Sequence, residues 1–276
     1  MFKREDGLAG SELQLACGQC IGCRLEYSRQ WAVRMYHEAQ LHDENSFITL
    51  TYDDDHLPFG NTLLRDELSR FMKRLRYYTG ANLRYYGVGE YGEETYRPHY
   101  HACLFGWAFP DREHWRTEKG YKYYRSPTLE RAWKLGNSEL TDFTFDTAAY
   151  CARYITKKIT GDDAQQHYER VDLDTGEIVE VLPEYARMSL NPAIAKEWWE
   201  KFGKSVVDWD SVVIDGKELP PPRYYDVLSD ESELQTRKLR RIRKAKASPD
   251  NTPERLAVRE ECKRQKLIHR LKRSYL

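Results

Sequence analysis

The sequence predicts an α+β protein with a central antiparallel β-sheet, flanking helices and a basic helical C-terminal tail. Stretches with helical spacing of apolar residues alternate with short β-branched and aromatic runs, in the order helix, strand, helix, strand, strand, helix. Short polar turns join the strand-like runs, which favours hairpins over parallel crossovers. The sequence contains neither GxGxxG nor GxxxxGKS/T, so a parallel nucleotide-binding fold is not indicated.

Composition narrows the class of protein further. The 276 residues are 40% hydrophobic and 13% aromatic with zero net charge, which excludes a disordered chain. No apolar run reaches the roughly 18 residues that a membrane span needs, and the first residues lack the apolar core of a secretory signal. The six cysteines do not form the pattern of a secreted disulfide framework. We therefore expect a soluble protein of a reducing cytosol, with no membrane contact.

The charge is distributed unevenly along the chain. Residues 237–276 hold 15 Lys and Arg against 4 Asp and Glu, a net charge of +11, so residues 1–236 carry −11. A segment this basic suits a phosphate backbone, although a solvated helical face explains it equally well. The turn-forming sequence SPDNTP at 248–253 predicts two helices with a hinge between them.

The first half of the chain contains three predicted elements. A helical stripe of apolar residues covers residues 24–42, and residues 47–52, FITLTY, are typical of a strand that places Thr49 and Thr51 on one face. From Leu64 the apolar spacing of an amphipathic helix runs to a closing Gly80.

The second half begins with a predicted hairpin of strands at 83–92 and 97–107. A helix capped by Asp146 and ended by Gly161 follows, and Asn191, Pro192 and Gly203 frame a further helix at 193–202. Between these two helices we expect a two-stranded insertion with its turn at 174–176.

Three side chains of the predicted hairpin form a candidate metal site. His99 and His101 project from the same face of an extended strand, about 6 to 7 Å apart. Glu90 lies on the preceding strand, opposite one of them if paired positions sum to about 189 to 191. Two imidazoles and a carboxylate suit Mn²⁺ or Mg²⁺, and Zn²⁺ is a further candidate. Two ordinary strand histidines are the alternative interpretation.

Two tyrosines form a second cluster on the helix that follows Asp146. Tyr150 and Tyr154 lie one turn apart on one face, and Arg153 and Lys157 each follow a tyrosine by three residues. Such cations can stabilise a phenolate or phosphate oxygens. The alternative is an aromatic stripe packed on the sheet beside solvated cations.

Five sequence blocks in this order resemble the rolling-circle replication initiators of the HUH endonuclease class, in particular those of gokushovirus-like microviruses. The blocks are CGQCIGCRLEYSRQWAVR at 17–34, FITLTYDDDHLP at 47–58, GEYGEETYRPHYHACLFG at 89–106, SPTLERAW at 126–133 and AAYCARYITKKITG at 148–161. The resemblance implies a metal motif at His99 and His101 completed by Glu90, and a nucleophile motif from Tyr154 to Lys157. Tyr150 departs from that motif because Arg153, not lysine, follows it.

The resemblance also implies a domain plan. Residues 1–45 would form a cysteine cluster and helix, and residues 46–205 the ferredoxin-like or RRM-like HUH core with an insertion at 162–190. An acidic linker at 206–236 and the basic helical tail at 237–276 would follow.

The implied function is nicking of single-stranded DNA at a phage origin. A tyrosine would displace the 3′ oxygen, forming a 5′-phosphotyrosine link that is later rejoined during rolling-circle replication. The expected partners are single-stranded or supercoiled origin DNA and the host helicase and polymerase, in the host bacterial cytoplasm. Thr49, Thr51, Arg97 and Lys158 are predicted DNA contacts.

Two other functions stay open at this point. One is a non-catalytic single-stranded DNA-binding or packaging protein, and the other is a relaxase or transposase of the same chemistry. Cys17, Cys20 and Cys23 could bind zinc with His37 or His42, or be free buried thiols. A base-stacking platform or core packing would explain a further aromatic and cationic set: Trp107, Arg112, Trp115, Arg116, Tyr121, Lys122, Tyr123, Tyr124 and Arg125.

Overall fold

The computed structural model describes residues 18, 20–92, 95–154, 158, 164–171 and 175–274, with the side chains of 251 and 267–274 excluded. The chain divides into two compact units, one of residues 28–248 and one of residues 1–27 with 249–276. The two units are described separately below. The predicted division into four segments stays a prediction.

A seven-stranded sheet forms the centre of the larger unit, and every neighbouring pair of its strands is antiparallel. The strand order is β4-β5-β6-β1-β3-β2-β9. The strands are β1 (Asn45–Tyr52), β2 (Arg84–Tyr91), β3 (Pro98–Phe105), β4 (Glu113–Glu118), β5 (Tyr121–Arg125), β6 (Gly136–Asp142) and β9 (Tyr185–Met188). The predicted α+β class with an antiparallel sheet is confirmed.

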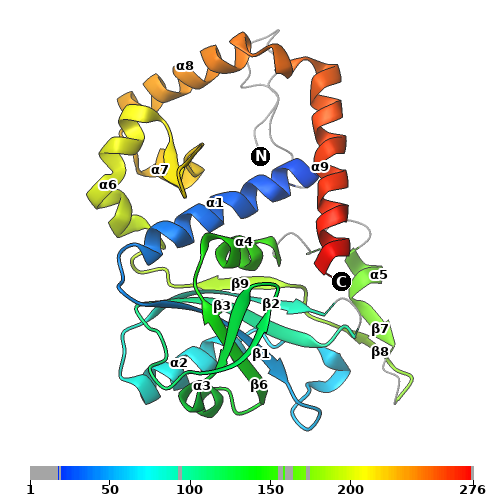
Figure 1. The fold of residues 1–276 in the computed structure, drawn as a ribbon. Helices are drawn as coiled ribbons and strands as arrows, with labels where there is room; N and C mark the ends of the chain where they lie inside the picture. Colours follow the sequence, from blue (N-terminus) through cyan, green and yellow to red (C-terminus); the bar gives the residue numbers. More distant parts are fainter. Residues whose placement is uncertain are drawn as a thin grey trace. The chain divides into compact units, whose positions relative to one another are not determined.

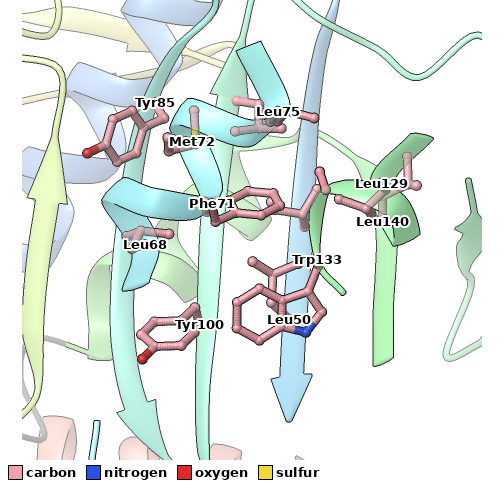
Figure 2. Close-up of a cluster of buried hydrophobic side chains, with 14 of the residues drawn as sticks. Leu50, Leu68, Phe71, Met72, Leu75, Tyr85, Tyr100, Leu129, Trp133 and Leu140 are labelled. Atoms are coloured by element: carbon pink, nitrogen blue, oxygen red, sulfur yellow. The ribbon is translucent and has the colours of Figure 1, made fainter. Parts of the chain in front are cut away.

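One face of the sheet is covered by α2 (Glu67–Thr79) and α3 (Pro127–Ala132) (Figure 1). Figure 2 shows Phe71 of α2 and Trp133 at the end of α3 packed over Leu50 of β1. The helix predicted from Leu64 is α2, which ends as expected at Gly80 in the left-handed conformation with φ of 66°. This face is an apolar core and carries none of the candidate site residues.

The opposite face is covered by α1 (Ile21–Ala39) and α4 (Phe145–Tyr154) (Figure 1). A second apolar cluster joins these helices to α6 (Lys196–Trp209), α7 (Arg223–Leu228) and the sheet. Within it the ring of His37 stacks on Trp198 at 3.6 Å and its Nδ1 lies 2.6 Å from the Tyr225 hydroxyl. The candidate site lies on this face.

Two predicted helix boundaries are wrong. Gly203 lies inside α6, which continues to Trp209, because its bare Cα makes room for the Trp199 ring, 2.6 Å from where a Cβ would stand. Asp146 lies in the first turn of α4, and Thr144 makes the capping hydrogen bond to the Thr147 amide instead, at 3.1 Å. The predicted end of that helix at Gly161 lies outside the described residues.

Several smaller elements complete the larger unit. The predicted insertion contains α5 (Ala164–Tyr168) and the paired strands β7 (Glu169–Val171) and β8 (Ile178–Glu180). A 3₁₀ turn, η2, covers Phe59–Asn61. Residues 206–236 include the end of α6, the hairpin of β10 (Val212–Ile214) and β11 (Lys217–Leu219), α7 and the start of the next helix.

The basic tail forms two helices, α8 (Glu231–Ala247) and α9 (Pro253–Ser274), separated by the 3₁₀ turn η4 (Pro249–Asn251). The predicted break at 248–253 is therefore confirmed, although α8 begins before residue 237. The Thr252 hydroxyl accepts a hydrogen bond from the Arg255 amide at 3.4 Å, as an N-cap does. In the part of the chain that the structure describes, no helix combines the length and apolarity that a membrane crossing needs.

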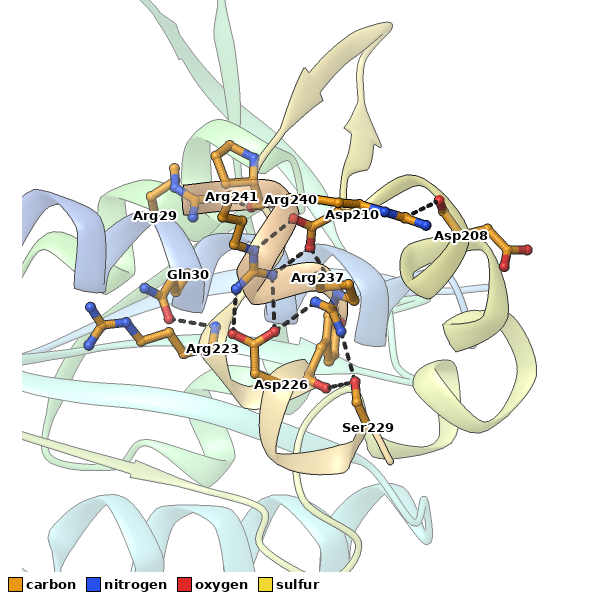
Figure 3. A network of polar contacts seen from close by, with 12 residues as sticks. Arg29, Gln30, Asp208, Asp210, Arg223, Asp226, Ser229, Arg237, Arg240 and Arg241 are labelled. Atoms are coloured by element: carbon orange, nitrogen blue, oxygen red, sulfur yellow. Dashed lines mark hydrogen bonds and ion pairs between the residues drawn. The ribbon is translucent and has the colours of Figure 1, made fainter. Parts of the chain in front are cut away.

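Charged side chains fasten α8 to the rest of the larger unit (Figure 3). Arg237 is only 1% exposed and contacts Asp210 at 2.9 Å, Asp226 at 2.7 Å and the Ser229 hydroxyl at 2.8 Å. Arg241 contacts the same two aspartates at 2.6 and 2.8 Å. Part of the basic run is thus an internal ion-pair network.

Candidate metal and tyrosine site

The β2–β3 hairpin brings the three predicted metal ligands together. Its register pairs Glu90 with His99, a sum of 189 as expected. The Glu90 Oε1 atom lies 2.9 Å from His101 Nε2 and 3.8 Å from His99 Nε2. One ligand atom from each residue lies within 4.8 Å of the others, and no other group of three or more potential ligands meets this condition among the described residues. The predicted triad therefore exists as a geometric cluster.

Neighbouring side chains hold the His101 ring in place. Thr49 of β1 is its register partner, and the Thr49 hydroxyl oxygen lies 3.0 Å from His101 Nδ1. That bond occupies Nδ1 and leaves Nε2 directed at Glu90. The Phe47 ring stacks on the His101 ring with centroids 5.7 Å apart. Sequence reasoning assigned Thr49 to DNA and missed Phe47, although its spacing of two from Thr49 puts both on one face.

The donor set fits a divalent cation. Two imidazole nitrogens and a carboxylate oxygen converge without a thiolate, which is the chemistry that Mn²⁺ and Mg²⁺ accept and that Zn²⁺ tolerates. Glu90 and His101 are buried and His99 is half-buried, so one edge of the cluster stays open to a ligand. A divalent metal is compatible with this site, and its identity is not fixed by the three ligands.

Both tyrosines of α4 pack against His101. The Tyr154 ring stacks on it with centroids 4.9 Å apart, and the Tyr150 ring meets it edge-on at 5.4 Å. The two phenol rings also contact each other, with centroids 4.7 Å apart. Tyr150 is 40% exposed and Tyr154 only 7%. The helix and the hairpin therefore place two phenols beside the metal ligands, one of them open to solvent.

The surroundings keep both phenols protonated at neutral pH. Burial raises the pKa of Tyr150 to about 12; the Glu90 charge adds to this, while the hydrogen bond with Tyr154 and the charge of Arg153 oppose it. Burial also raises the pKa of Tyr154 well above its usual value, and the Glu90 charge acts in the same direction. A positive charge brought to Glu90 would oppose the Glu90 contribution at both phenols.

The remaining predicted site residues lie at different distances from this cluster. Thr51 is half-buried and is the register partner of His99. The Arg97 guanidinium bonds the Tyr52 carbonyl at 3.1 Å and Asp54 at 2.6 Å, which fixes it at the end of β1. The Arg153 guanidinium carbon lies 5.9 Å from the centre of the Tyr150 ring. Lys158 is exposed, and Lys157 lies outside the described residues.

The structure does not test the predicted zinc site. Cys20 is exposed and Cys23 half-buried at the start of α1, and Cys17 lies outside the described residues. A different pair of thiols lies between the sheet and α4, where buried Cys103 of β3 hydrogen-bonds with buried Cys151 of α4. Sequence reasoning missed this pair because 48 residues separate the two cysteines.

Comparison with known proteins places these elements in a family. The profile of a family described as replication-associated protein ORF2 matches residues 45–159, which include the metal ligands and both tyrosines. No solved structure gives a significant match to the chain.

Three replication-associated proteins of small phages are similar over most of the chain. VP4 of Bdellovibrio phage phiMH2K is 37% identical over 220 residues, covering 76% of this chain and 65% of VP4. ORF2 of Spiroplasma virus 4 is 33% identical, covering 76% of this chain and 66% of ORF2. ORF4 of Chlamydia phage 1 is 31% identical, covering 83% of this chain and 58% of ORF4.

The chain spans just under two thirds of the first two relatives and less of the third. The similarity nevertheless covers three quarters or more of this chain, and the family profile falls on the strands and the helix that build the candidate site. The chain therefore belongs to the ORF2 family of replication-associated proteins, with relatives among the gokushovirus-like microviruses.

Proposed function

We propose that this protein is a replication initiator endonuclease that nicks and rejoins single-stranded DNA through a tyrosine. The observation that carries the proposal is the contact of Tyr150 and Tyr154 with His101, a member of the triad. Nucleophile and metal ligands would therefore share one cluster on one face of the sheet. Membership of a family of replication-associated proteins supports DNA as the substrate.

The reaction exchanges one phosphodiester for another. The phenol oxygen forms a bond to the phosphorus, the bond from phosphorus to the 3′ oxygen breaks, and the proton lost by the phenol is balanced by the one gained at the 3′ oxygen. The 5′ end of the DNA is then esterified to tyrosine. Because one ester replaces another, the reverse step can reseal the strand without ATP.

The residues of this chain would divide the work by position. Glu90, His99 and His101 would hold a divalent cation, which supplies positive charge to the scissile phosphate when bound. Thr49 and Phe47 fix the His101 ring. Arg153 would stabilise negative charge that develops on the phosphate or on the phenol oxygen.

Two adjacent tyrosines suit repeated cycles of cutting and joining. While one holds a 5′ end, the other can cut the regenerated origin after a full circle. The free 3′-OH would serve as primer for the host polymerase, with a host helicase separating the strands in the bacterial cytoplasm. These partners follow from the proposed chemistry.

The test is direct detection of the covalent product. Single-stranded origin-region DNA labelled on the 3′ side of the cut is incubated with the protein and Mn²⁺, and the DNA-linked peptide is identified by mass spectrometry. We expect phosphotyrosine at 150 or 154, with no adduct in EDTA. The Tyr150→Phe/Tyr154→Phe double variant should form no adduct, and an adduct that survives in it would refute the assignment.

The exposed cations of α8 favour one alternative, a non-catalytic single-stranded DNA-binding or packaging protein. It predicts metal-independent, salt-dependent binding that is unchanged in His99→Ala, and no covalent product. A relaxase or transposase of the same chemistry predicts an adduct that requires hairpin DNA. The same assay with linear and hairpin substrates separates the three functions.

A further inference from the structure

The β4–β5 hairpin presents two large aromatic side chains to solvent. Trp115 is 46% exposed and Tyr121 is 39% exposed. We propose that this hairpin is a single-stranded DNA-binding surface on which Trp115 and Tyr121 stack unpaired bases of the strand that enters or leaves the candidate site. The inference rests on the proposed nicking function and adds a binding surface to it.

The structure separates these two aromatics from the others in the same sequence region. Tyr124 and Trp107 pack against the apolar core, and Tyr123 is half-buried under the Arg116 guanidinium at 3.9 Å. Core packing and cation–π contacts therefore account for three of the five. Trp115 and Tyr121 keep exposed area that these contacts do not explain.

The strand register puts this surface on the same face of the sheet as the metal ligands. Tyr124 pairs with Leu140, and both belong to the opposite, core-packed face. Alternation along the strand then turns Tyr121 and Arg125 to the site face. Trp115 lies at the irregular position of β4, and the Arg125 guanidinium covers its ring at 4.1 Å, so it shares that face.

A row of polar side chains connects the hairpin to the site. Arg116 of β4 contacts both carboxylate oxygens of Glu139 in β6, at 3.0 and 3.1 Å. Glu139 is the register partner of Thr49, which bonds His101. The hairpin and the metal ligands are thus joined across β6, β1 and β3 of one sheet.

The charge of the hairpin suits a nucleic acid. Five Lys and Arg stand against two Glu between residues 112 and 125. Aromatic faces interleaved with cations are the pattern that binds single strands, because each base offers a face for stacking and each phosphate a charge for pairing. A duplex hides its bases, so stacking on Trp115 and Tyr121 requires single-stranded DNA.

The experiment compares single-stranded and duplex DNA in a chain that cannot cut. The Tyr150→Phe/Tyr154→Phe variant is titrated with fluorescein-labelled oligothymidylate, and the dissociation constant is read from anisotropy. Adding Trp115→Ala or Tyr121→Ala should weaken binding about tenfold each, the size of a lost base stack. Trp115→Phe should restore most of the affinity. Trp209→Ala and Tyr77→Ala remove exposed aromatics elsewhere and should change nothing.

Duplex DNA of the same length is the second arm of the experiment. Affinity for duplex DNA should be equal in parent and variants, because only charge contacts operate there. Equal single-strand affinity in Trp115→Ala and the parent, or equal losses with duplex and single strand, would overturn the inference. The adduct assay on chains with intact tyrosines is scored separately. An adduct with unchanged affinity refutes only this inference, and lost affinity without an adduct refutes only the nicking function.

Discussion

At the scale of single residues, the candidate site depends on a few side chains with separate tasks. Tyr150 and Tyr154 carry the same hydroxyl on the same helix, but Tyr150 is 40% exposed and Tyr154 only 7%. Their contacts also differ, since Tyr154 lies flat on His101 and Tyr150 meets it edge-on. An attacking oxygen must reach phosphorus in line, so access decides which phenol acts on incoming DNA.

The first prediction concerns that difference. Tyr150→Phe should reduce adduct formation in the first turnover by about a thousandfold, because it removes the accessible nucleophile. Tyr154→Phe should leave most of the first cut and reduce the rejoining that requires a second phenol. Single-turnover gels with excess protein measure both steps. Equal losses of the first cut in the two variants would contradict the assignment.

A second prediction concerns Thr49, which touches the metal site only through His101. Thr49→Val keeps the side-chain shape and removes the hydroxyl that bonds His101 Nδ1. Loss of such an outer partner lowers metal affinity by about 10 to 100-fold, which a Mn²⁺ titration followed by electron paramagnetic resonance would show. Thr51→Val removes a hydroxyl from the same strand without removing the bond from Thr49 to His101. It should bind Mn²⁺ as the parent does.

At the scale of elements, α1, α6 and α7 meet around one buried imidazole. Burial lowers the pKa of His37 to about 3, so the folded chain holds this ring neutral. An unfolded histidine has a pKa of about 6.5. Between these two values the unfolded state binds more protons than the folded state, and protonation therefore favours unfolding.

The third prediction follows from that sign. The free energy of unfolding should fall as the pH drops below about 6.5, with His37 contributing about 1.4 kcal/mol per pH unit. His37→Gln places an amide that cannot be protonated opposite the Tyr225 hydroxyl. Its unfolding free energy should vary less between pH values of about 6.5 and 5, as measured by urea denaturation. The same pH dependence in parent and variant would show that His37 does not control it.

The contact between α8 and the rest of the larger unit is largely electrostatic. Arg237→Met should destabilise the fold by about 3 kcal/mol, because it leaves Asp210 and Asp226 with less positive charge beside them. The matched variant Arg240→Met removes an exposed arginine from the same helix and should change stability by less than about 0.5 kcal/mol. Urea unfolding of both measures the difference. Equal stability of the two would show that the network contributes nothing.

At the scale of the whole molecule, local patterns predicted most of the fold. The apolar spacing from Leu64 to Leu75 identified α2, and alternation with a short turn identified the β2–β3 hairpin and its register. The metal cluster was predictable for the same reason, since one hairpin supplies all three ligands. The tyrosines lie on a different element, and only the resemblance to a family placed them in the same site.

The features that sequence reasoning missed depend on contacts between distant residues. Strands β4 and β5 are exposed at most positions, so they lack the apolar alternation that marks a strand. Strand β9 is half-buried along its length and its sequence resembles part of an insertion. The burial of Arg237 depends on Asp210 and Asp226, 27 and 11 residues away, and nothing in a run of basic letters distinguishes it from its exposed neighbours.

The anchoring of Arg237 also sets a limit on how the protein can be shortened. A chain that stops at the end of α7 would keep every candidate catalytic side chain and lose the guanidinium groups that neutralise Asp210 and Asp226. Two aspartates would then repel each other beneath the surface that α8 covers. A truncation that removes the basic run to improve solubility must therefore retain the chain through Arg241, or replace both acids as well.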